Sequence, residues 1–324
     1  MPGETYTRHA VTDGMSWHKI LDRYAPLVFL VVLAFGLSAT TRGFAGGNNL
    51  LNIARQHSII IVLAVGQTLV MISGGIDLSV GSVLALSGVV AGVLSASGVA
   101  LPLCGICGIA TGCLCGAING VVTAKARVPA FIATLGMMGM ARGIALVLSG
   151  GVNIGLSSEV STWTGEHSYL MALLFIGIMV LVGVGCHILL KKTPLGRHNY
   201  AIGGNREAAR LSGINIDRHV IIVFSINGLI AGLAGMMMLG YITVADPTAG
   251  EGYELDSIAA AVIGGTSLFG GRGNIGGTVV GAFILAVLRN GCDLRNISEH
   301  WQRFVVGLMT IAAVFYDKLR RGSD

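Results

Sequence analysis

Charged side chains are scarce in this sequence. Of the 324 residues, 11% are charged and 53% are hydrophobic, whereas soluble domains carry about 25% charged residues. The composition argues against a soluble domain. It predicts an all-α, polytopic membrane protein.

A phosphate-binding loop is also missing. The chain has no Gly-Lys dipeptide, which the G-x-x-x-x-G-K-[ST] motif requires, so if ATP drives this protein another chain hydrolyses it. His-Glu-x-x-His and Gly-x-Ser-x-Gly are absent as well. The six cysteines lie mostly in apolar runs, where cysteine packs as a small hydrophobe. We therefore expect no catalytic residue, no metal site and no enzyme.

Long apolar runs dominate the sequence instead. A run of about 20 apolar residues is long enough to cross a bilayer as a helix, and about ten such runs are present. The 49 glycines suit helices that pack closely within a membrane. The predicted spans are 24–41, 51–72, 80–98, 101–124, 129–149, 169–190, 220–241, 255–270, 273–290 and 300–317.

Basic residues predict the orientation of these spans, because Lys and Arg resist translocation. They precede the first run, follow the last and fill the segment 191–219, whereas the loops 150–168 and 245–256 hold carboxylates and no Lys or Arg. With both termini in the cytoplasm, the net charge of +5 faces anionic lipid rather than nucleic acid. The predicted parts are a cytoplasmic segment 1–23, a membrane domain 24–318 and a cytoplasmic tail 319–324.

Glycine interrupts the predicted spans at two places. Ser73-Gly74-Gly75-Ile76-Asp77-Leu78-Ser79-Val80-Gly81 follows the second span, and a second glycine-rich stretch covers residues 252–273. Glycine weakens a helix, and non-helical backbone at membrane depth is tolerated only inside protein or beside water. Short, glycine-broken segments in two halves of a transporter often mark its transport path.

Asp77 is the most distinctive residue of the first interruption, because a carboxylate near membrane depth is costly. It either caps the helix that follows or lines or gates a path. Ser79, Asn119, Thr134 and Asn227 are the other candidates for the path or gate, since their polar groups suit a neutral polyhydroxylated solute. Such residues also bond helices to one another, and both interpretations stay open.

Arg142 is a cation inside the predicted span 129–149. We expect its side chain to face the bundle interior, paired with a carboxylate or with carbonyl groups for assembly, or to snorkel toward the surface.

Residues 191–219 form a basic island between two apolar spans, with six Lys and Arg against two carboxylates. A plain connection between two helices needs only a few residues. A cytoplasmic loop of this length is therefore expected to dock another component.

Within this island, Glu207-Ala208-Ala209-Arg210-Leu211-Ser212-Gly213 resembles the Glu-Ala-Ala-x-x-x-Gly coupling signature of bacterial ABC-importer permeases. A short alanine-rich helix is stiff, Glu207 suits its first turn, and Gly213 can end it. With the segments 74–81, 129–136, 196–205, 247–256 and 264–268, the chain resembles the ribose-type monosaccharide permease family over about residues 25–318.

The resemblance implies a permease of the bacterial inner membrane, in which two copies, identical or paralogous, form the path. A cytoplasmic ATPase, which binds ATP and Mg²⁺, would dock on the loop that carries Glu207, Ala208, Ala209 and Gly213. A periplasmic sugar-binding protein would deliver the solute, and this chain would hold no cofactor. The expected function is import of a small neutral sugar, ribose-like or a polyol, by alternating access.

A stand-alone, ion-coupled secondary transporter is the alternative. It predicts buried carboxylates on several spans, and only Asp77 qualifies clearly in the sequence. A membrane-embedded enzyme would need a reactive cluster at membrane depth, and the sequence displays none.

Overall fold

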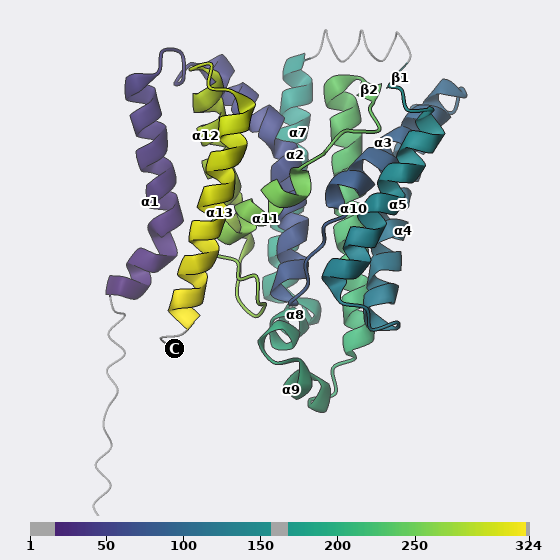
Figure 1. Cartoon of the computed structure of the whole chain (residues 1–324), viewed down its shortest axis with the longest axis vertical. Helices are drawn as coiled ribbons and strands as arrows, with labels where there is room; N and C mark the ends of the chain where they lie inside the picture. Colours follow the sequence, from purple (N-terminus) through teal and green to yellow (C-terminus); the bar gives the residue numbers. More distant parts are fainter. Residues whose placement is uncertain (1–16, 157–167, 322–324) are drawn as a thin grey trace, which may run out of the picture.

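The computed structural model describes residues 17–156 and 168–321, which form a bundle of helices with one short β-ladder (Figure 1). The helices before the basic island are α1 (Trp17–Thr40), α2 (Gly47–Ile72), α3 (Val80–Ala96), α4 (Leu101–Ala124), α5 (Ala130–Ser149) and α7 (Ser168–Lys192). The island forms α8 (Pro194–Gly204) and α9 (Arg206–Leu211). The remaining helices are α10 (Ile216–Ile242), α11 (Tyr253–Ile263), α12 (Ile275–Asp293) and α13 (Glu299–Arg321). Strand β1 (Ile154–Gly155) pairs antiparallel with β2 (Val244–Ala245).

Each predicted span overlaps one helix, and the all-α, polytopic membrane class is confirmed. By length and composition, 6 described helices could cross a membrane: α2, α4, α5, α7, α10 and α12. The apolar stretches Tyr24–Thr40 and Val80–Ala96 are shorter. Helix α1 begins at Trp17, inside the segment expected to precede the membrane domain.

The predicted span 255–270 is wrong in its length. Helix α11 has 11 residues, or about 17 Å at 1.5 Å per residue, which is too short for a hydrocarbon core of about 30 Å. The helix ends because Gly265 adopts a positive φ of 88° and Thr266 donates its N–H back to the carbonyl of Ala261. The apolar side chains that follow belong to a loop.

Glycine contacts bring α4 and α10 together along their length. A methyl group at Gly116 would overlap the Phe224 carbonyl and approach the Gly228 Cα to 2.9 Å. Gly112 meets Gly232 in the same way one turn further on. The expectation that glycine serves close packing of membrane helices is confirmed at this pair. Cys115 and Cys186 lie in the same hydrophobic core.

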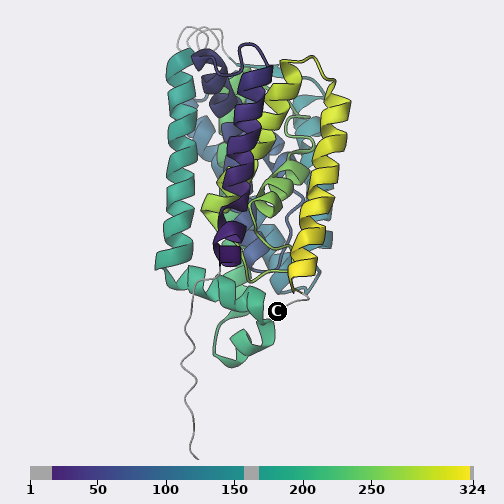
Figure 2. The same cartoon turned by 90° about the vertical axis from the view of Figure 1, so that its left-hand side faces the viewer.

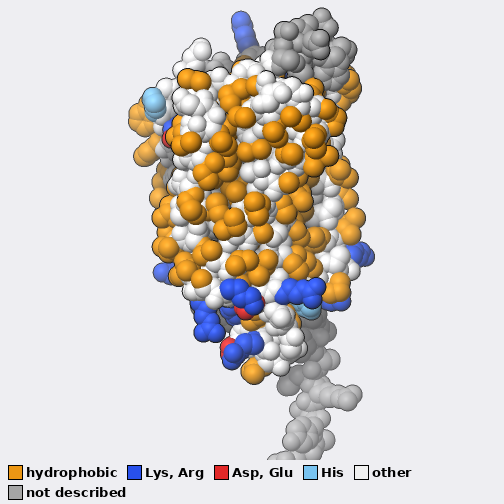
Figure 3. All heavy atoms as spheres, turned by 90° about the vertical axis from the view of Figure 1, so that its right-hand side faces the viewer, with side chains coloured by type: hydrophobic (Ala, Val, Ile, Leu, Met, Phe, Trp, Pro, Cys, Tyr) orange, Lys and Arg blue, Asp and Glu red, His pale blue; other side chains and the backbone are white. Residues whose placement is uncertain are grey.

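The helices run along one common axis, and α8 and α9 lie across one end of the bundle (Figures 1 and 2). The first turn of α1 and the last turn of α13 lie at that same end (Figure 1). Hydrophobic side chains cover the face drawn in Figure 3, and Lys and Arg gather below them at the α8–α9 end. The opposite end also carries positive charge. Arg295 lies there and donates to the Thr41 hydroxyl at 2.9 Å.

Candidate functional site

Two non-helical segments meet in the middle of the bundle. Residues 73–79 connect α2 to α3, and residues 246–252 lead from β2 into α11 (Figure 1). The first turn of α3, directly after the first segment, touches the second segment where a methyl group at Gly81 would overlap the Gly250 carbonyl. Gly250 itself has a φ of 70°, which glycine adopts without strain. The predicted break at residues 73–81 is confirmed over residues 73–79. The predicted stretch 252–273 is only partly non-helical, because α11 occupies residues 253–263, and the second broken segment instead covers residues 246–252.

Asp77 is held by hydrogen bonds on both oxygens of its carboxylate. Oδ1 accepts from the Ser79 amide at 2.9 Å and from the Ser79 hydroxyl at 2.6 Å. Oδ2 accepts from Asn227 of α10 at 2.9 Å. Asn119 of α4 extends the network by donating to Ser79 Oγ at 3.0 Å. The amide that Asp77 accepts from belongs to Ser79, the N-cap residue two positions later, so Asp77 shapes the turn before α3 and is not itself the helix cap.

The backbone around Asp77 is held by two more side chains. Thr134 of α5 accepts from the Leu78 amide at 3.1 Å and donates to the Ile76 carbonyl at 3.2 Å. The Gln67 amide, oriented to satisfy its neighbours, donates to the Asp77 carbonyl at 3.2 Å and accepts from its N–H at 3.1 Å. Four helices thus fix one extended segment.

All five residues predicted to line or gate a path therefore come together. None of them exposes more than 2% of its surface: Asp77, Ser79, Asn119, Thr134 and Asn227. In this conformation they form a closed network of hydrogen bonds around Asp77, and none of them lines the cavities described below. Their role in a path or gate stays a prediction.

Arg142 holds the second broken segment. Its guanidinium donates to the carbonyls of Pro247 at 2.6 Å and Ala249 at 3.0 Å. The expected pairing with carbonyl groups is confirmed. Because Thr134 and Arg142 both belong to α5, this one helix fixes both broken segments.

The basic island folds into two short helices, and α9 carries the coupling signature. Asn205 caps α9 by accepting from the Ala208 amide at 2.9 Å. Glu207 lies in the first turn and pairs with Arg210 at 2.6 Å, and Ala209 is buried. Gly213, at φ 82°, ends the helix, with Ile214 donating to the Ala209 carbonyl. The expected stiff helix is present.

Helix α8 is attached to the end of α2, directly before the first broken segment, and to the loop that follows α11. Asn199 donates to the Leu69 carbonyl in the last turn of α2 at 2.8 Å, and His219 Nε2 contacts Asn199 Oδ1 at 2.8 Å. Tyr200 donates its hydroxyl to the Gly273 carbonyl at 2.8 Å, beyond α11. Burial raises the pKa of Tyr200, which keeps the phenol protonated as a donor. Gly203 lies so close to the Ile72 carbonyl that a methyl group would overlap it.

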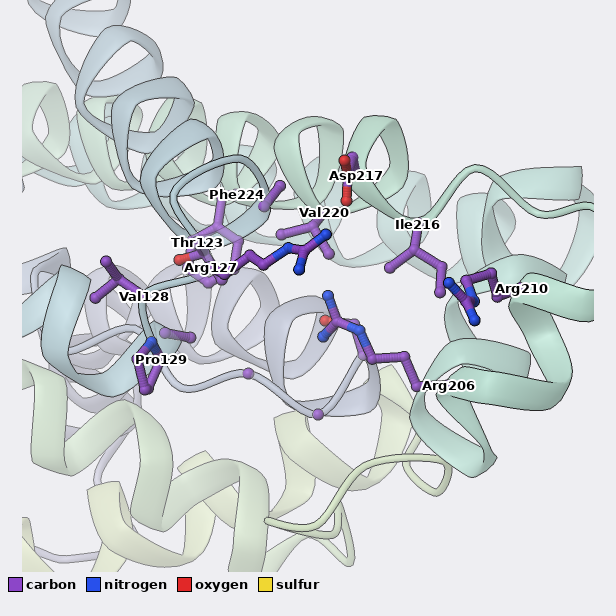
Figure 4. Close-up of a pocket in the computed structure, with 15 residues that line it drawn as sticks. Thr123, Arg127, Val128, Pro129, Arg206, Arg210, Ile216, Asp217, Val220 and Phe224 are labelled. Carbon is purple, nitrogen blue, oxygen red and sulfur yellow. The ribbon is translucent and has the colours of Figure 1, made fainter.

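A cavity of about 560 Å³ lies between α9 and the first broken segment (Figure 4). Ser73, Gly74 and Gly75 form part of its wall, and Arg127 and Arg206 point toward one another across it (Figure 4). Thr123 Oγ1 is buried there without a hydrogen-bond partner among the described residues. With Arg210 and one carboxylate, Asp217, also in the lining, the cavity carries net positive charge. It extends from the basic island to the start of the segment that leads to Asp77.

A second polar region was missed by the sequence analysis. Asp256 of α11 and Arg289 of α12 form an ion pair of 2.6 Å. The pair borders two adjoining cavities of about 320 and 450 Å³. Both residues are ionisable side chains inside predicted spans, which is the signal that would have identified them.

Comparison with known proteins places the chain among transport permeases. A family model described as branched-chain amino acid transport system / permease component matches residues 49–314. The ribose import permease protein RbsC of Escherichia coli (strain K12) is 44% identical over 91% of this chain and 93% of its own length. The fructose import permease protein FrcC of Rhizobium meliloti is 36% identical over 90% and 84%. The xylose transport system permease protein XylH of Escherichia coli (strain K12) is 34% identical over 98% and 97%. No solved structure shows a significant match.

An apolar helical bundle with two broken segments at its centre and a helical basic loop at one end defines a membrane permease. The chain belongs to the family of branched-chain amino acid transport system permease components, and the resemblance to its ribose-type sugar permeases is confirmed.

Proposed function

We propose that this chain is the permease subunit of an ATP-binding-cassette importer that moves a small neutral sugar or polyol across the bacterial inner membrane. The observation that carries the proposal is the attachment of α8 to the end of α2 and to the loop after α11, in a chain 44% identical to a ribose import permease. Named relatives for ribose, fructose and xylose support the sugar class and leave the particular sugar open.

The cytoplasmic ATPase docks on α8 and α9 and binds ATP and Mg²⁺, since this chain has no phosphate-binding loop. Glu207 and Ala208 are exposed and form the contact. Ala209 anchors the helix to the permease, and Gly213 turns the chain back toward α10. A helix with such defined ends transmits force as one body.

The positively charged cavity beside α9 takes an acidic side chain of the ATPase. Neither Arg127 nor Arg206 has an acidic partner among the described residues, and Thr123 offers an unused hydroxyl. A carboxylate between the two guanidinium groups would relieve their repulsion with charge-assisted hydrogen bonds. Ser73 to Gly75 line the same cavity, so an ATPase side chain bound there contacts the segment that carries Asp77.

Transport proceeds by alternating access. Movement of α8 under ATPase closure shifts the last turn of α2 through Asn199 and the loop after α11 through Tyr200. The hydrogen-bond network around Asp77 acts as the gate, which is closed in this conformation. Its members are Asp77, Ser79, Asn119, Thr134 and Asn227. Interfaces and packed cores switch between discrete arrangements, which amplifies a small displacement.

The complete importer contains further components. A second permease copy, identical or paralogous, completes the path within the lipid bilayer, and a periplasmic sugar-binding protein supplies the solute. About ten membrane segments, with α11 as a half-length one, leave both termini and α8–α9 in the cytoplasm. The parts are then an N-terminal segment 1–23, the membrane domain 24–318 and a tail 319–324.

Reconstitution in liposomes tests the proposal. Radiolabelled ribose, fructose and xylose are offered to this permease alone under a proton or sodium gradient, and to the permease with its ATPase, binding protein and ATP. Uptake is expected only in the complete system. Uptake by the permease alone would support the ion-coupled secondary transporter instead.

A further inference from the structure

A polar chamber lies in the half of the bundle away from α8 and α9. It consists of the two adjoining cavities, which share Tyr253, Arg289, Glu299 and Arg303. His57 precedes the α8-bound end of α2 by 12 residues, or about 18 Å along the helix. Arg289 lies 14 residues beyond the start of α12, or about 21 Å, and α12 starts beside that same end of α2, where Gly271 donates to the Ile72 carbonyl. The chamber therefore lies nearer the end of the bundle opposite α8 and α9.

An ion pair at its wall joins the half-length helix to the rest of the bundle. Arg289 and Asp256 are 2.6 Å apart, and their side chains are 21% and 11% exposed. Ionisable side chains at membrane depth are costly and usually functional. Glu299 and Arg303 form a second ion pair in the lining, and Glu251 and Asp293 add two more carboxylates. Because carboxylates outnumber arginines, the lining suits a solute that donates hydrogen bonds from hydroxyl groups.

Hydrogen-bonding groups face the chamber without a partner. His57 is 8% exposed, lines the smaller cavity and makes no hydrogen bond among the described residues. Tyr253 is half-buried, its side chain makes no hydrogen bond among the described residues, and it lines both cavities. A buried polar side chain normally has a partner, and a bound solute supplies one.

The lining suits a sugar. A polyol both donates and accepts hydrogen bonds, which matches a carboxylate, a guanidinium, an imidazole and the amide of Gln56. The ring of Tyr253 offers an apolar surface for the C–H face of the solute. The cavity volumes of about 320 and 450 Å³ fall within the range of about 300–1,000 Å³ that is usual for small-molecule sites.

We propose that this chamber is the site where the permease receives the sugar on its outer side. Asp256 and Arg289 bind the hydroxyl groups, His57 completes the hydrogen bonds, and Tyr253 packs against the ring. The site rests on the proposed function and specifies its substrate contacts. Because the loop after α11 is bonded to Tyr200 of α8, closure of the ATPase displaces α11 and with it Tyr253 and Asp256. Binding and release are thereby linked to ATP.

Uptake and ATP hydrolysis measured together in proteoliposomes test the site. The permease is reconstituted with its ATPase and binding protein, and radiolabelled ribose, fructose and xylose are the probes. Tyr253→Ala, Asp256→Asn and Arg289→Gln are expected to lower uptake of the transported sugar roughly ten- to hundredfold. ATP hydrolysis stimulated by the binding protein is expected to continue, because α8 and α9 are untouched.

Two further variants keep the test interpretable. Arg295→Gln removes an arginine near the same end of the bundle that lines neither cavity, and it should leave uptake unchanged. Tyr253→Phe retains the ring and the packing, so its loss of uptake should be smaller than that of Tyr253→Ala.

The outcomes separate this site from the proposed function. Normal uptake in Tyr253→Ala and Arg289→Gln would overturn the site, as would equal losses of uptake and hydrolysis in correctly assembled Tyr253→Phe and Arg289→Gln complexes. Failure of the unaltered complex to move any of the three sugars with ATP would instead overturn the proposed function.

Discussion

Asn199 of α8 donates a hydrogen bond of 2.8 Å to the carbonyl of Leu69, in the last turn of α2. Asn199 is fully buried, and its side-chain oxygen contacts His219 at 2.8 Å. One amide therefore connects the basic island, the start of α10 and the turn that precedes Asp77. This arrangement explains how a force applied to the loop reaches the centre of the bundle.

Removal of this hydrogen bond should weaken the coupling between ATP hydrolysis and sugar transport. Asn199→Ala leaves the Leu69 carbonyl and the His219 ring without their partner, which costs about 1–3 kcal/mol of stability. We expect fewer sugar molecules imported per ATP hydrolysed by the reconstituted complex. Asn205→Ala, which removes only the cap of α9, is the control for loop stability. An unchanged ratio of uptake to hydrolysis in Asn199→Ala would contradict the coupling route.

The surface of α9 should be required for transport and dispensable for membrane insertion. Glu207→Arg reverses an exposed charge, and Gly213→Pro imposes a negative φ where the chain has φ 82°. Both variants are expected to reach the membrane in normal amounts and to lose ATP-driven uptake, as measured in membrane vesicles. Arg42→Glu is the matched charge reversal, because Arg42 lies in the loop before α2, at the opposite end of the bundle. Wild-type transport by both α9 variants would refute the coupling assignment.

The cavity between Arg127 and Arg206 should contribute to ATPase binding. A double substitution, Arg127→Glu with Arg206→Glu, replaces two donors of charge-assisted hydrogen bonds by carboxylates. We expect the purified permease to retain less ATPase in a pull-down, with the difference shrinking as salt is raised. Lys191→Glu with Lys192→Glu changes the net charge of the chain by the same amount, at residues outside this cavity. Equal ATPase retention by the two double variants would contradict the assignment.

The contact between α4 and α10 should tolerate no side chain. Gly116→Val places methyl groups against the Phe224 carbonyl and Gly228, and overpacking of this kind costs about 1–3 kcal/mol or more. The thermal unfolding midpoint in detergent should fall. Gly105→Val on the same helix meets nothing within 4 Å and should leave the midpoint unchanged. A similar midpoint for both variants would argue against the close packing of α4 on α10.

The hydrogen-bond network around Asp77 provides a test of the alternative function, an ion-coupled secondary transporter. Asp77→Asn keeps the shape and presents an amide group to donors on Ser79 or Asn227, which leaves at least one of them unpaired. We expect a lower unfolding midpoint and impaired uptake that still requires ATP. Ser38→Ala, which alters an exposed hydroxyl of α1, is the control. Proton-dependent uptake that is abolished by Asp77→Asn would favour an ion-coupled carrier.

The sequence alone predicted most of the bundle, because the length of an apolar run and the bilayer thickness are local quantities. The span 101–124 coincides with α4, and the break after α2 is located by Gly74 and Gly75. Gly213 likewise ends α9 as expected. The error at 255–270 arose because composition did not distinguish an apolar loop from an apolar helix.

The tertiary structure alone decided which distant polar residues meet. Asp77 and Asn227 are 150 residues apart in sequence, and Arg289 and Asp256 are 33 apart. Hydropathy and the resemblance to sugar permeases determined the class of protein from the residues alone, since both depend on composition and short motifs. Three features depend on how helices rotate and cross: the hydrogen-bond network around Asp77, the attachment of α8, and the chamber beside Asp256 and Arg289. Those features come from packing among several elements at once, which no single stretch of sequence specifies.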